Sequence, residues 1–368
     1  MAERNSVGTA WLALDDGTVF AGVLAVRGSD TTRWGEVVFN TALTGYQEIL
    51  TDPSYAGQLV VLTYPLIGNY GVNPAWAESR HLAARGLIVR ELDEPDALSL
   101  TLSEYCRRQG VWLLTGVDTR ALTRHLREAG TRRGLIVDDL AAAREAPARL
   151  AGESLHGIVD TVAADAVYEL PGDGPHIAVL DYGVKNSILR ALQDRGARLT
   201  VMPGTVSPDA LDAVKPDGVV LSSGPGDPED LRDRLALVGH AVSHYPTFGI
   251  CFGHQLIALA AGGRTYPLKF GHHGANHPVR DERSGKVAIT SHNHGYAVAE
   301  DSLPPGWRVR FRNLHDHTVE GLWHEDLPVL TVQHHPEAGP GPHDAAPLFD
   351  EFMDGFGRGP AGKGDARA

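Results

Sequence analysis

A cysteine that stands between two glycines is the clearest candidate for chemistry in this sequence. The stretch Phe248–Gln255 reads FGICFGHQ, so an apolar strand is expected to run straight into a helix, with Cys251 at the junction. Gly249 and Gly253 remove the side chains that would clash in so sharp a turn. The N-terminus of the following helix would stabilise a thiolate and point N–H groups at developing negative charge. Cys251 is therefore a candidate nucleophile, with the packing of an inert buried thiol as the alternative.

A histidine and a glutamate that follow a later apolar strand are candidates for assisting this thiol. The sequence QHHPE follows the strand expected at Val329–Val332, and residues two apart in an extended chain face the same side, so His335 and Glu337 can point toward one site. Pro336 keeps His335 out of the helical region. A cysteine nucleophile needs a base, and the base needs an orienting partner. These two residues suit both roles, although His-Pro-Glu taken alone would be an ordinary turn after a strand.

A glycine-rich loop follows a third apolar strand. Residues 221–228 read LSSGPGDP, and a loop at the carboxyl end of a parallel strand lies where open α/β sheets bind ligands. Its glycines allow backbone N–H groups to come close to a substrate or an oxyanion. Taken alone, Gly-Pro-Gly would indicate an ordinary tight turn.

The elements around these residues predict an α/β fold. From His176 onward, short apolar strands alternate with helices, which predicts a mostly parallel sheet flanked by helices, with later strands at Val287–Ser291 and Trp307–Asn313. Before that point, a hairpin around the turn Asp15–Gly17 and a helix capped by Asp118 indicate a mixed α+β domain. We therefore predict an N-terminal domain at 1–150, a linker at 151–175, a second domain at 176–357 and a disordered tail at 358–368.

Composition excludes several classes of protein. The 368 residues suit two domains, and the net charge of −13 argues against binding to nucleic acid or to an anionic membrane surface. Only two cysteines, with no apparent secretory signal or transmembrane stretch, predict a cytoplasmic location. Close histidine pairs such as His272/His273 and His292/His294 match no standard zinc spacing, so we predict no metal site.

Three motifs together resemble a known family. GPGDP, GICFGHQ and HPEA occur in the order and spacing of the class I, or triad-type, glutamine amidotransferases. FNTALTGYQEILTDPSYAGQ near the start, together with KFGHHGANHPV and NHGYAV, extends the resemblance over nearly the whole chain, to the small, glutamine-hydrolysing subunits of carbamoyl phosphate synthetase. The resemblance implies that 176–357 is the amidotransferase domain and that 1–150 docks on the synthetase large subunit.

The resemblance also implies roles for particular residues. Cys251 would be the nucleophile, His335 the general base and acid, and Glu337 the group that orients His335. Backbone N–H groups of Phe252 and Gly226 would form the oxyanion hole. The positions expected to bind L-glutamine are Ser54, Gly224, Gly226, Phe252, Gln255, Asn293, Gly295 and Tyr296.

The implied activity is hydrolysis of L-glutamine to glutamate and ammonia through a thioester on Cys251. The large subunit would use the ammonia with bicarbonate and ATP to make carbamoyl phosphate for arginine and pyrimidine biosynthesis. No cofactor is expected on this chain, since it lacks a GxxxxGK[ST] or GxGxxG motif; ATP and magnesium are expected on the large subunit. Two alternatives remain open: an amidase or peptidase of the same architecture that acts on another amide, and a non-catalytic relative, a class that normally lacks the triad.

Overall fold

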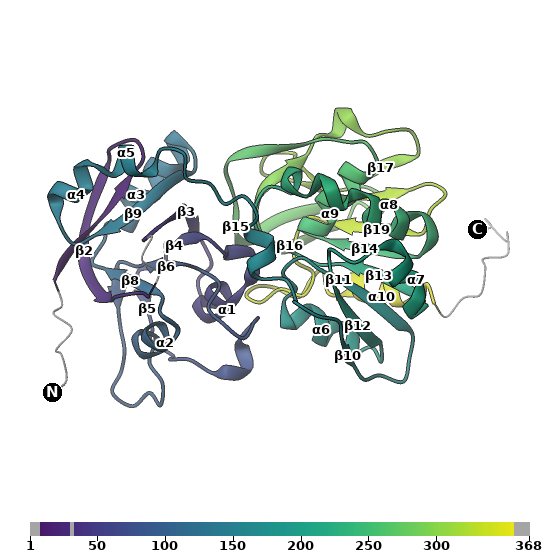
Figure 1. Cartoon of the computed structure of the whole chain (residues 1–368), viewed down its shortest axis with the longest axis horizontal. Coiled ribbons are helices and arrows are strands. Elements are labelled where there is room, and N and C mark those ends of the chain that lie inside the picture. The colour runs from purple at the N-terminus through teal and green to yellow at the C-terminus, as the bar shows by residue number, and fades with distance from the viewer. Residues whose placement is uncertain (1–7, 30–32, 357–368) are drawn as a thin grey trace.

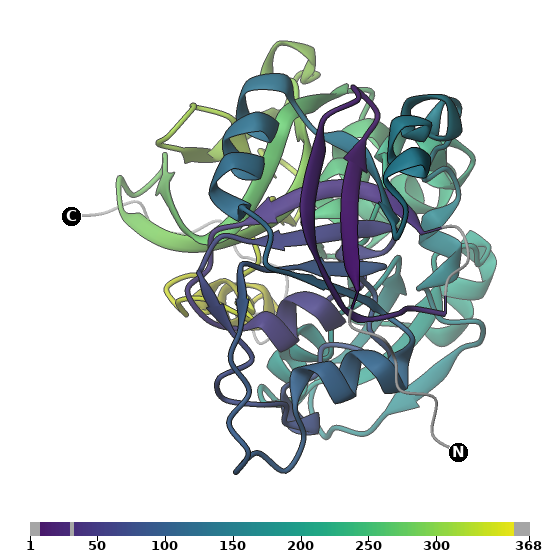
Figure 2. The same ribbon diagram turned by 90° about the vertical axis from the view of Figure 1, so that its left-hand side faces the viewer.

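The computed structural model describes residues 8–29 and 33–356, and in this part of the chain the N-terminal region closes into a barrel of seven strands (Figures 1 and 2). In barrel order the strands are β1 (Thr9–Leu14), β2 (Val19–Val26), β8 (Trp112–Thr115), β6 (Gly86–Ile88), β4 (Gln58–Leu62), β3 (Trp34–Asn40) and β9 (Arg132–Val137). β1 and β2 form the predicted hairpin, with Ala13 opposite Val19. Closure was not predicted, because it depends on the pairing of β1 with β9, the first and last strands of the barrel.

Alternate residues of the barrel strands pack against different helices. Leu59 and Val61 of β4 share a core with Leu122 of α3 (Thr119–Ala129), whereas Val60 contacts the core that contains Ile49 of α1 (Tyr46–Thr51). The predicted cap of α3 is confirmed, since Asp118 accepts a hydrogen bond from the N–H of Ala121 at 2.9 Å. The remaining elements of this region are η1 (Pro53–Tyr55), β5 (Leu66–Ile67), η2 (Pro74–Trp76), β7 (Glu91–Leu92), α2 (Leu102–Gln109), α4 (Leu140–Arg144) and α5 (Ala146–Leu150).

The rest of the described chain forms a ten-stranded sheet, which lies to the right of the barrel in Figure 1. Its order is β10 (Tyr168–Leu170), β12 (Arg198–Pro203), β11 (His176–Asp181), β13 (Gly218–Leu221), β14 (Thr247–Ile250), β19 (Val329–Val332), β18 (Val319–His324), β17 (Trp307–Asn313), β15 (Thr265–Asp281) and β16 (Val287–Val298). The strands from β12 to β19 in this order are parallel, and the strands from β18 to β16 extend the sheet in antiparallel pairs. The predicted α/β class is confirmed.

Helices cover both faces of the parallel strands. Ile177 and Val179 of β11 share a core with α6 (Asn186–Gln193) and α10 (Pro347–Asp354), whereas Ala178 and Leu180 face α7 (Pro208–Val214), α8 (Leu235–His244) and α9 (Phe252–Ala260). Every residue of β14 is buried between these layers. The carboxyl end of β14 is therefore held rigidly, and the functional side chains that follow it are held with it.

The segment 151–175, predicted to be a linker, contains η3 (Ile158–Thr161) and β10, which pairs with β12 at the edge of the sheet. The barrel and the sheet also share backbone hydrogen bonds, such as Thr41 N–H to His273 O at 3.2 Å and Asn186 N–H to Glu78 O at 2.8 Å. The tail predicted at 358–368 lies outside the described residues. Within the described ranges, no helix has the length and apolar character needed to cross a membrane.

Candidate active site

Cys251 lies on the sharp turn between β14 and α9, as the sequence predicted. It is buried, and its backbone has φ 53° and ψ −101°, a conformation that is strained for a residue with a side chain. Its N–H donates to Val332 O at 2.7 Å, which ties the turn to the end of β19. A Cβ on Gly253 would run into the carbonyl oxygen of Leu221, and one on Gly249 would meet the Ile257 side chain and the Gly253 backbone, both in α9. Both glycines are therefore needed for α9 to pack this closely against β13 and β14.

His335 is held by Glu337 in the loop after β19. His335 Nδ1 lies 2.6 Å from Glu337 Oε1, and both side chains are buried. Lys185, which comes from the turn between β11 and α6, places Nζ 3.0 Å from the same oxygen and donates to Ala338 O at 2.6 Å. With Nδ1 occupied by Glu337, Nε2 is the ring nitrogen of His335 that has no conventional hydrogen bond. The structure thus brings the predicted histidine and glutamate together and leaves one nitrogen for proton transfer.

The charges of these groups support one another. Burial lowers the pKa of His335, but Glu337 and the nearby Cys251 outweigh burial and raise that pKa to about 10. Burial raises the pKa of Glu337, but the Lys185 ammonium and His335 hold it at about 2. Burial also lowers the pKa of Lys185, and the carboxylates of Glu337 and Glu78 raise it above its usual range. At neutral pH a charged His335 therefore stands beside Cys251.

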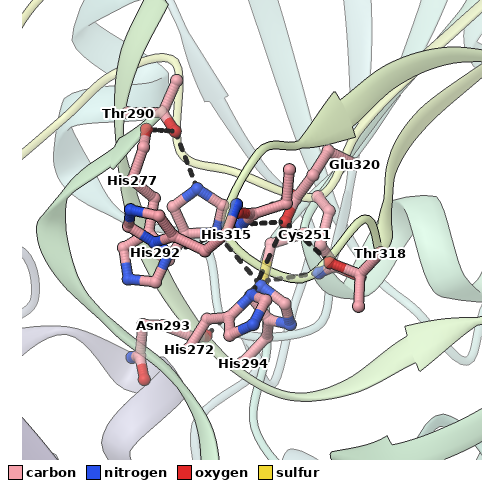
Figure 3. Close-up of polar contacts among 12 residues, drawn as sticks. Cys251, His272, His277, Thr290, His292, Asn293, His294, His315, Thr318 and Glu320 are labelled. Atoms are coloured by element: carbon pink, nitrogen blue, oxygen red, sulfur yellow. Dashed lines mark hydrogen bonds and ion pairs between the residues drawn. The ribbon is translucent and has the colours of Figure 1, made fainter. Parts of the chain in front are cut away.

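The sulfur of Cys251 faces β16 and a glutamine side chain. The thiol donates to Asn293 O at 3.6 Å, and Gln333 Nε2 donates to Sγ at 3.6 Å; Cys251 and Asn293 are both labelled in Figure 3. Gln255 Nε2 in turn donates to Gln333 Oε1 at 3.0 Å and to Tyr296 O at 2.9 Å. The side chain of Gln255, predicted to bind glutamine, thus also positions Gln333 beside the thiol.

A cleft of ≈ 740 Å³ opens over Cys251 between the barrel and the sheet. Every position predicted to bind glutamine lines it: Ser54, Gly224, Gly226, Phe252, Gln255, Asn293, Gly295 and Tyr296. His335 and Glu337 are not among its lining residues. The structure therefore gathers all the predicted positions around one thiol, with the base and its partner buried behind the cleft surface.

The barrel contributes to one wall of the cleft through η1. Ser54 is buried, and its hydroxyl has no hydrogen-bond partner among the described residues. Asp52 accepts the N–H of Ser54 at 2.9 Å with one oxygen and Asn293 Nδ2 at 3.0 Å with the other. His273 Nδ1 lies 3.0 Å from Asn293 Oδ1. The Asn293 amide is therefore fixed by partners from both the barrel and the sheet.

Four residues of this site were not predicted: Lys185, Gln333, Asp52 and His273. Lys185 follows the carboxyl end of a parallel strand, as the glycine-rich loop does. Open α/β sheets bind ligands at these ends, so the position of Lys185 in the sequence could have indicated a role in the site. Gln333 and Asp52 stand within two positions of predicted residues. The roles of His273 and Asp52 depend on pairings between segments far apart in the sequence, for which no local pattern exists.

A second group of ionisable residues lies next to the cleft. His272, His292, His294 and Glu320 are buried, and each offers a ligand atom within 4.8 Å of the others. His294 also lines the cleft. The prediction that the chain holds no metal was based on sequence spacing, whereas these residues come from β15, β16 and β18.

Comparisons with known proteins cover both regions of the chain. The family described as carbamoyl-phosphate synthase small chain, CPSase domain, matches residues 12–136, and the family glutamine amidotransferase class-I matches residues 178–354. A carbamoyl phosphate synthase small chain from Symbiobacterium thermophilum is 51% identical, with 92% of this chain and 96% of that one covered. A carbamoyl phosphate synthase arginine-specific small chain from Halalkalibacterium halodurans is 46% identical, with coverages of 94% and 96%. A solved glutamine amidotransferase from Thermotoga maritima matches 45% of this chain and 77% of its own, at 16% identity and a TM-score of 0.36.

Proposed function

The chain belongs to the family of carbamoyl phosphate synthase small chains, and on that premise we propose that Cys251, His335 and Glu337 are the residues with which it hydrolyses glutamine. The class I glutamine amidotransferase domain at 178–354 accounts for the activity itself, release of ammonia from glutamine. The observation that carries the assignment is the 2.6 Å contact between His335 Nδ1 and Glu337 Oε1. Because Glu337 occupies Nδ1, Nε2 is the ring nitrogen available to exchange a proton with Cys251, which interacts with His335.

In the first half of the reaction, the thiolate sulfur of Cys251 bonds to the side-chain amide carbon of glutamine. The electron pair of the C=O bond moves to oxygen, and the N–H groups of Phe252 and Gly226 stabilise that oxyanion. The N–H of Phe252 is the first of α9, so it has no acceptor within the helix. When the C–N bond breaks, protonated His335 gives its proton to the leaving nitrogen. Ammonia departs, and a γ-glutamyl thioester remains on Cys251.

In the second half, neutral His335 takes a proton from water as the water oxygen bonds to the thioester carbon. The tetrahedral intermediate again places its negative charge at the oxyanion hole, and the C–S bond breaks when it collapses. The product leaves with its new carboxyl group, which loses its proton to solvent to give glutamate; the thiolate of Cys251 is restored, and His335 is protonated for the next turnover. Lys185 acts as a positioning residue, since it keeps Glu337 ionised and Glu337 keeps His335 in one tautomer and orientation.

The remaining assignments are also part of the proposal. The eight cleft positions bind L-glutamine, and the ammonia is used by a synthase large subunit, which supplies the ATP and magnesium chemistry with bicarbonate. This chain carries no cofactor for glutamine hydrolysis and works in the cytoplasm, in arginine and pyrimidine biosynthesis. The support for the partner is the match of 12–136 to the small-chain domain, because this region is separate from the amidotransferase domain.

The test is the variant Cys251→Ser, assayed after reconstitution with the large subunit. Glutamine hydrolysis should fall at least about a thousandfold, as expected when a nucleophile is removed, while carbamoyl phosphate synthesis from added ammonia should persist. Cys106→Ala is the matched control, since Cys106 is the other buried cysteine and lies in the barrel core. Loss of both activities together in Cys251→Ser, or retention of glutamine hydrolysis, would overturn the assignment.

A further inference from the structure

Three buried histidines and a buried glutamate converge beside the cleft, and each offers a possible ligand atom to the same point. His272 lies on β15, His292 and His294 lie on β16, and Glu320 lies on β18 (Figure 3). Glu320 is fully buried, and its Oε2 has no hydrogen-bond partner among the described residues. The Nδ1 of His272 is likewise without a hydrogen-bond partner there. Buried polar atoms without partners are uncommon in folded proteins, and a bound ion would satisfy both of these atoms.

Outer hydrogen bonds fix the tautomers of His292 and His294. The hydroxyl of Thr290 donates to the carbonyl oxygen of His277, so it accepts the proton of His292 Nε2, which lies 2.7 Å away. His294 Nδ1 lies 2.8 Å from the carbonyl oxygen of Tyr296, which can only accept. His292 Nδ1 and His294 Nε2 are consequently both lone-pair nitrogens, and they face each other at 3.1 Å. Two acceptors at this distance repel each other unless a cation lies between them.

His272 follows the same pattern. Its Nε2 lies 2.7 Å from a carboxylate oxygen of Asp316, which accepts the Nε2 proton, so a cation bound at Nδ1 would take the place of any proton there. Each of the three imidazoles is thus anchored through one nitrogen to an oxygen acceptor and directs the other nitrogen to the cluster. Histidines that bind metal ions usually have the same arrangement, in which the nitrogen that does not bind the ion donates its proton to a carboxylate or carbonyl oxygen.

The separations suit a tetrahedral zinc site. Ligands at the usual Zn–N and Zn–O distances lie about 3.3 Å apart in a tetrahedron. Here His292 Nδ1 and His294 Nε2 are 3.1 Å apart, and the two carboxylate oxygens of Glu320 lie 3.5 Å from His272 Nδ1 and 3.6 Å from His292 Nδ1. One ligand atom from each of the four residues lies within 4.8 Å of the other three. Charge also balances in the ion-bound form, since a divalent cation that displaces the Nδ1 proton of His272 leaves three neutral imidazoles and neutralises the carboxylates of Glu320 and Asp316.

We propose that His272, His292, His294 and Glu320 bind one zinc ion. The site is closed, with four protein ligands and no open position, so its role is structural rather than catalytic. The ion would join β15, β16 and β18 directly behind Asn293 and Gly295, which line the cleft. It is distinct from the Cys251 chemistry, and the hydrolysis of glutamine requires no metal step.

Metal content tests the proposal. The full chain is produced in zinc-supplemented medium and purified without a metal-affinity tag. It should contain about one zinc ion per chain, as measured by inductively coupled plasma mass spectrometry. His292→Gln and Glu320→Gln should lose the zinc, whereas His315→Gln should keep it. His315 is the matched control because it is exposed and lies near the cluster, with its ring 5.3 Å from that of His277, but provides none of the four ligands.

Two further measurements keep the test decisive if a ligand variant fails to fold. Asp316→Asn changes a half-exposed outer partner, and it should weaken zinc binding by about 10–100-fold. Replacement of zinc by cobalt(II) in the unaltered chain should give the visible absorption bands of a tetrahedral site, and a chelator should lower its melting temperature. A folded chain without zinc, or zinc that persists in His292→Gln and Glu320→Gln but is lost in Cys251→Ser, would overturn the proposal.

Discussion

At the scale of single residues, the active site is a buried row of groups whose charges alternate. The Lys185 ammonium contacts Glu337, Glu337 contacts His335, and His335 stands beside the Cys251 thiol. Each ion has a large desolvation cost in such a place, and the favourable pairs offset it only while all the partners remain. The charge arrangement of the site therefore depends on Lys185 as much as on Glu337 and His335.

The raised pKa of His335 predicts how stability changes with pH. A group whose pKa is higher in the folded state stabilises the fold fully below its unfolded value, and this contribution is lost as pH rises toward the folded value. For His335 these limits are 6.5 and about 10. The stability of the wild type relative to His335→Gln should thus fall across this range, by more than about 1 kcal/mol, since one pKa unit corresponds to about 1.4 kcal/mol. Urea unfolding at several pH values measures this, and a difference that stays constant would contradict it.

At the scale of elements, the turn from β14 into α9 is what makes the thiol available. The helix approaches the neighbouring strand β13 so closely that only a hydrogen is tolerated at Gly253, next to the carbonyl of Leu221. The strained backbone of Cys251 persists because β14 is buried on both faces and the turn is tied to β19.

Gly253→Ala should therefore be destabilising by about 1–3 kcal/mol, as overpacking usually is. It should also lower glutamine hydrolysis by roughly a hundredfold, because the thiol and the oxyanion donors would shift together. Gly239→Ala in α8 is the matched control, since a Cβ there meets nothing within 4 Å. That variant should be more stable by about 0.5–1 kcal/mol, with normal activity. Thermal unfolding and a glutaminase assay measure both effects, and equal behaviour of the two variants would contradict the account.

The elements were more predictable from the sequence than their long-range pairings. Short apolar runs predicted β14 and β19, and the glycines on either side of Cys251 predicted its turn, because these signals are local. The same runs could not show the barrel closing through β1 and β9, nor Asp52 reaching Asn293, since both depend on segments far apart in the chain. The histidine cluster was missed for this reason as well, because its ligands come from three strands.

At the scale of the whole molecule, the cleft is shared between the barrel and the sheet. η1 delivers Ser54 to the cleft, and Asp52 links that turn to Asn293 on β16. The barrel is thus part of the cleft proposed to bind glutamine, as well as the region matched to the small-chain domain. Under the proposed function, a change in the position of the barrel should alter glutamine binding directly.

Ser54→Ala should accordingly raise the KM for glutamine about fivefold with little change in kcat, the expected loss of one hydrogen bond worth about 1 kcal/mol. The reason is that its buried hydroxyl has no protein partner among the described residues and faces the cleft. Ser154→Ala is the control, because Ser154 is exposed at the same cleft. Steady-state kinetics measure KM and kcat for both variants, and Ser154→Ala should leave both constants unchanged. An unchanged KM in Ser54→Ala would contradict this role of Ser54.

The central claim is that Cys251 forms a covalent bond to the substrate, and rapid acid quenching followed by mass spectrometry tests it most directly. Protein mixed with glutamine and quenched during turnover should carry a γ-glutamyl group on the peptide that contains Cys251, and the His335→Gln variant should form less of it. An adduct on Cys106, or the absence of any adduct while glutamate is being released, would contradict the account.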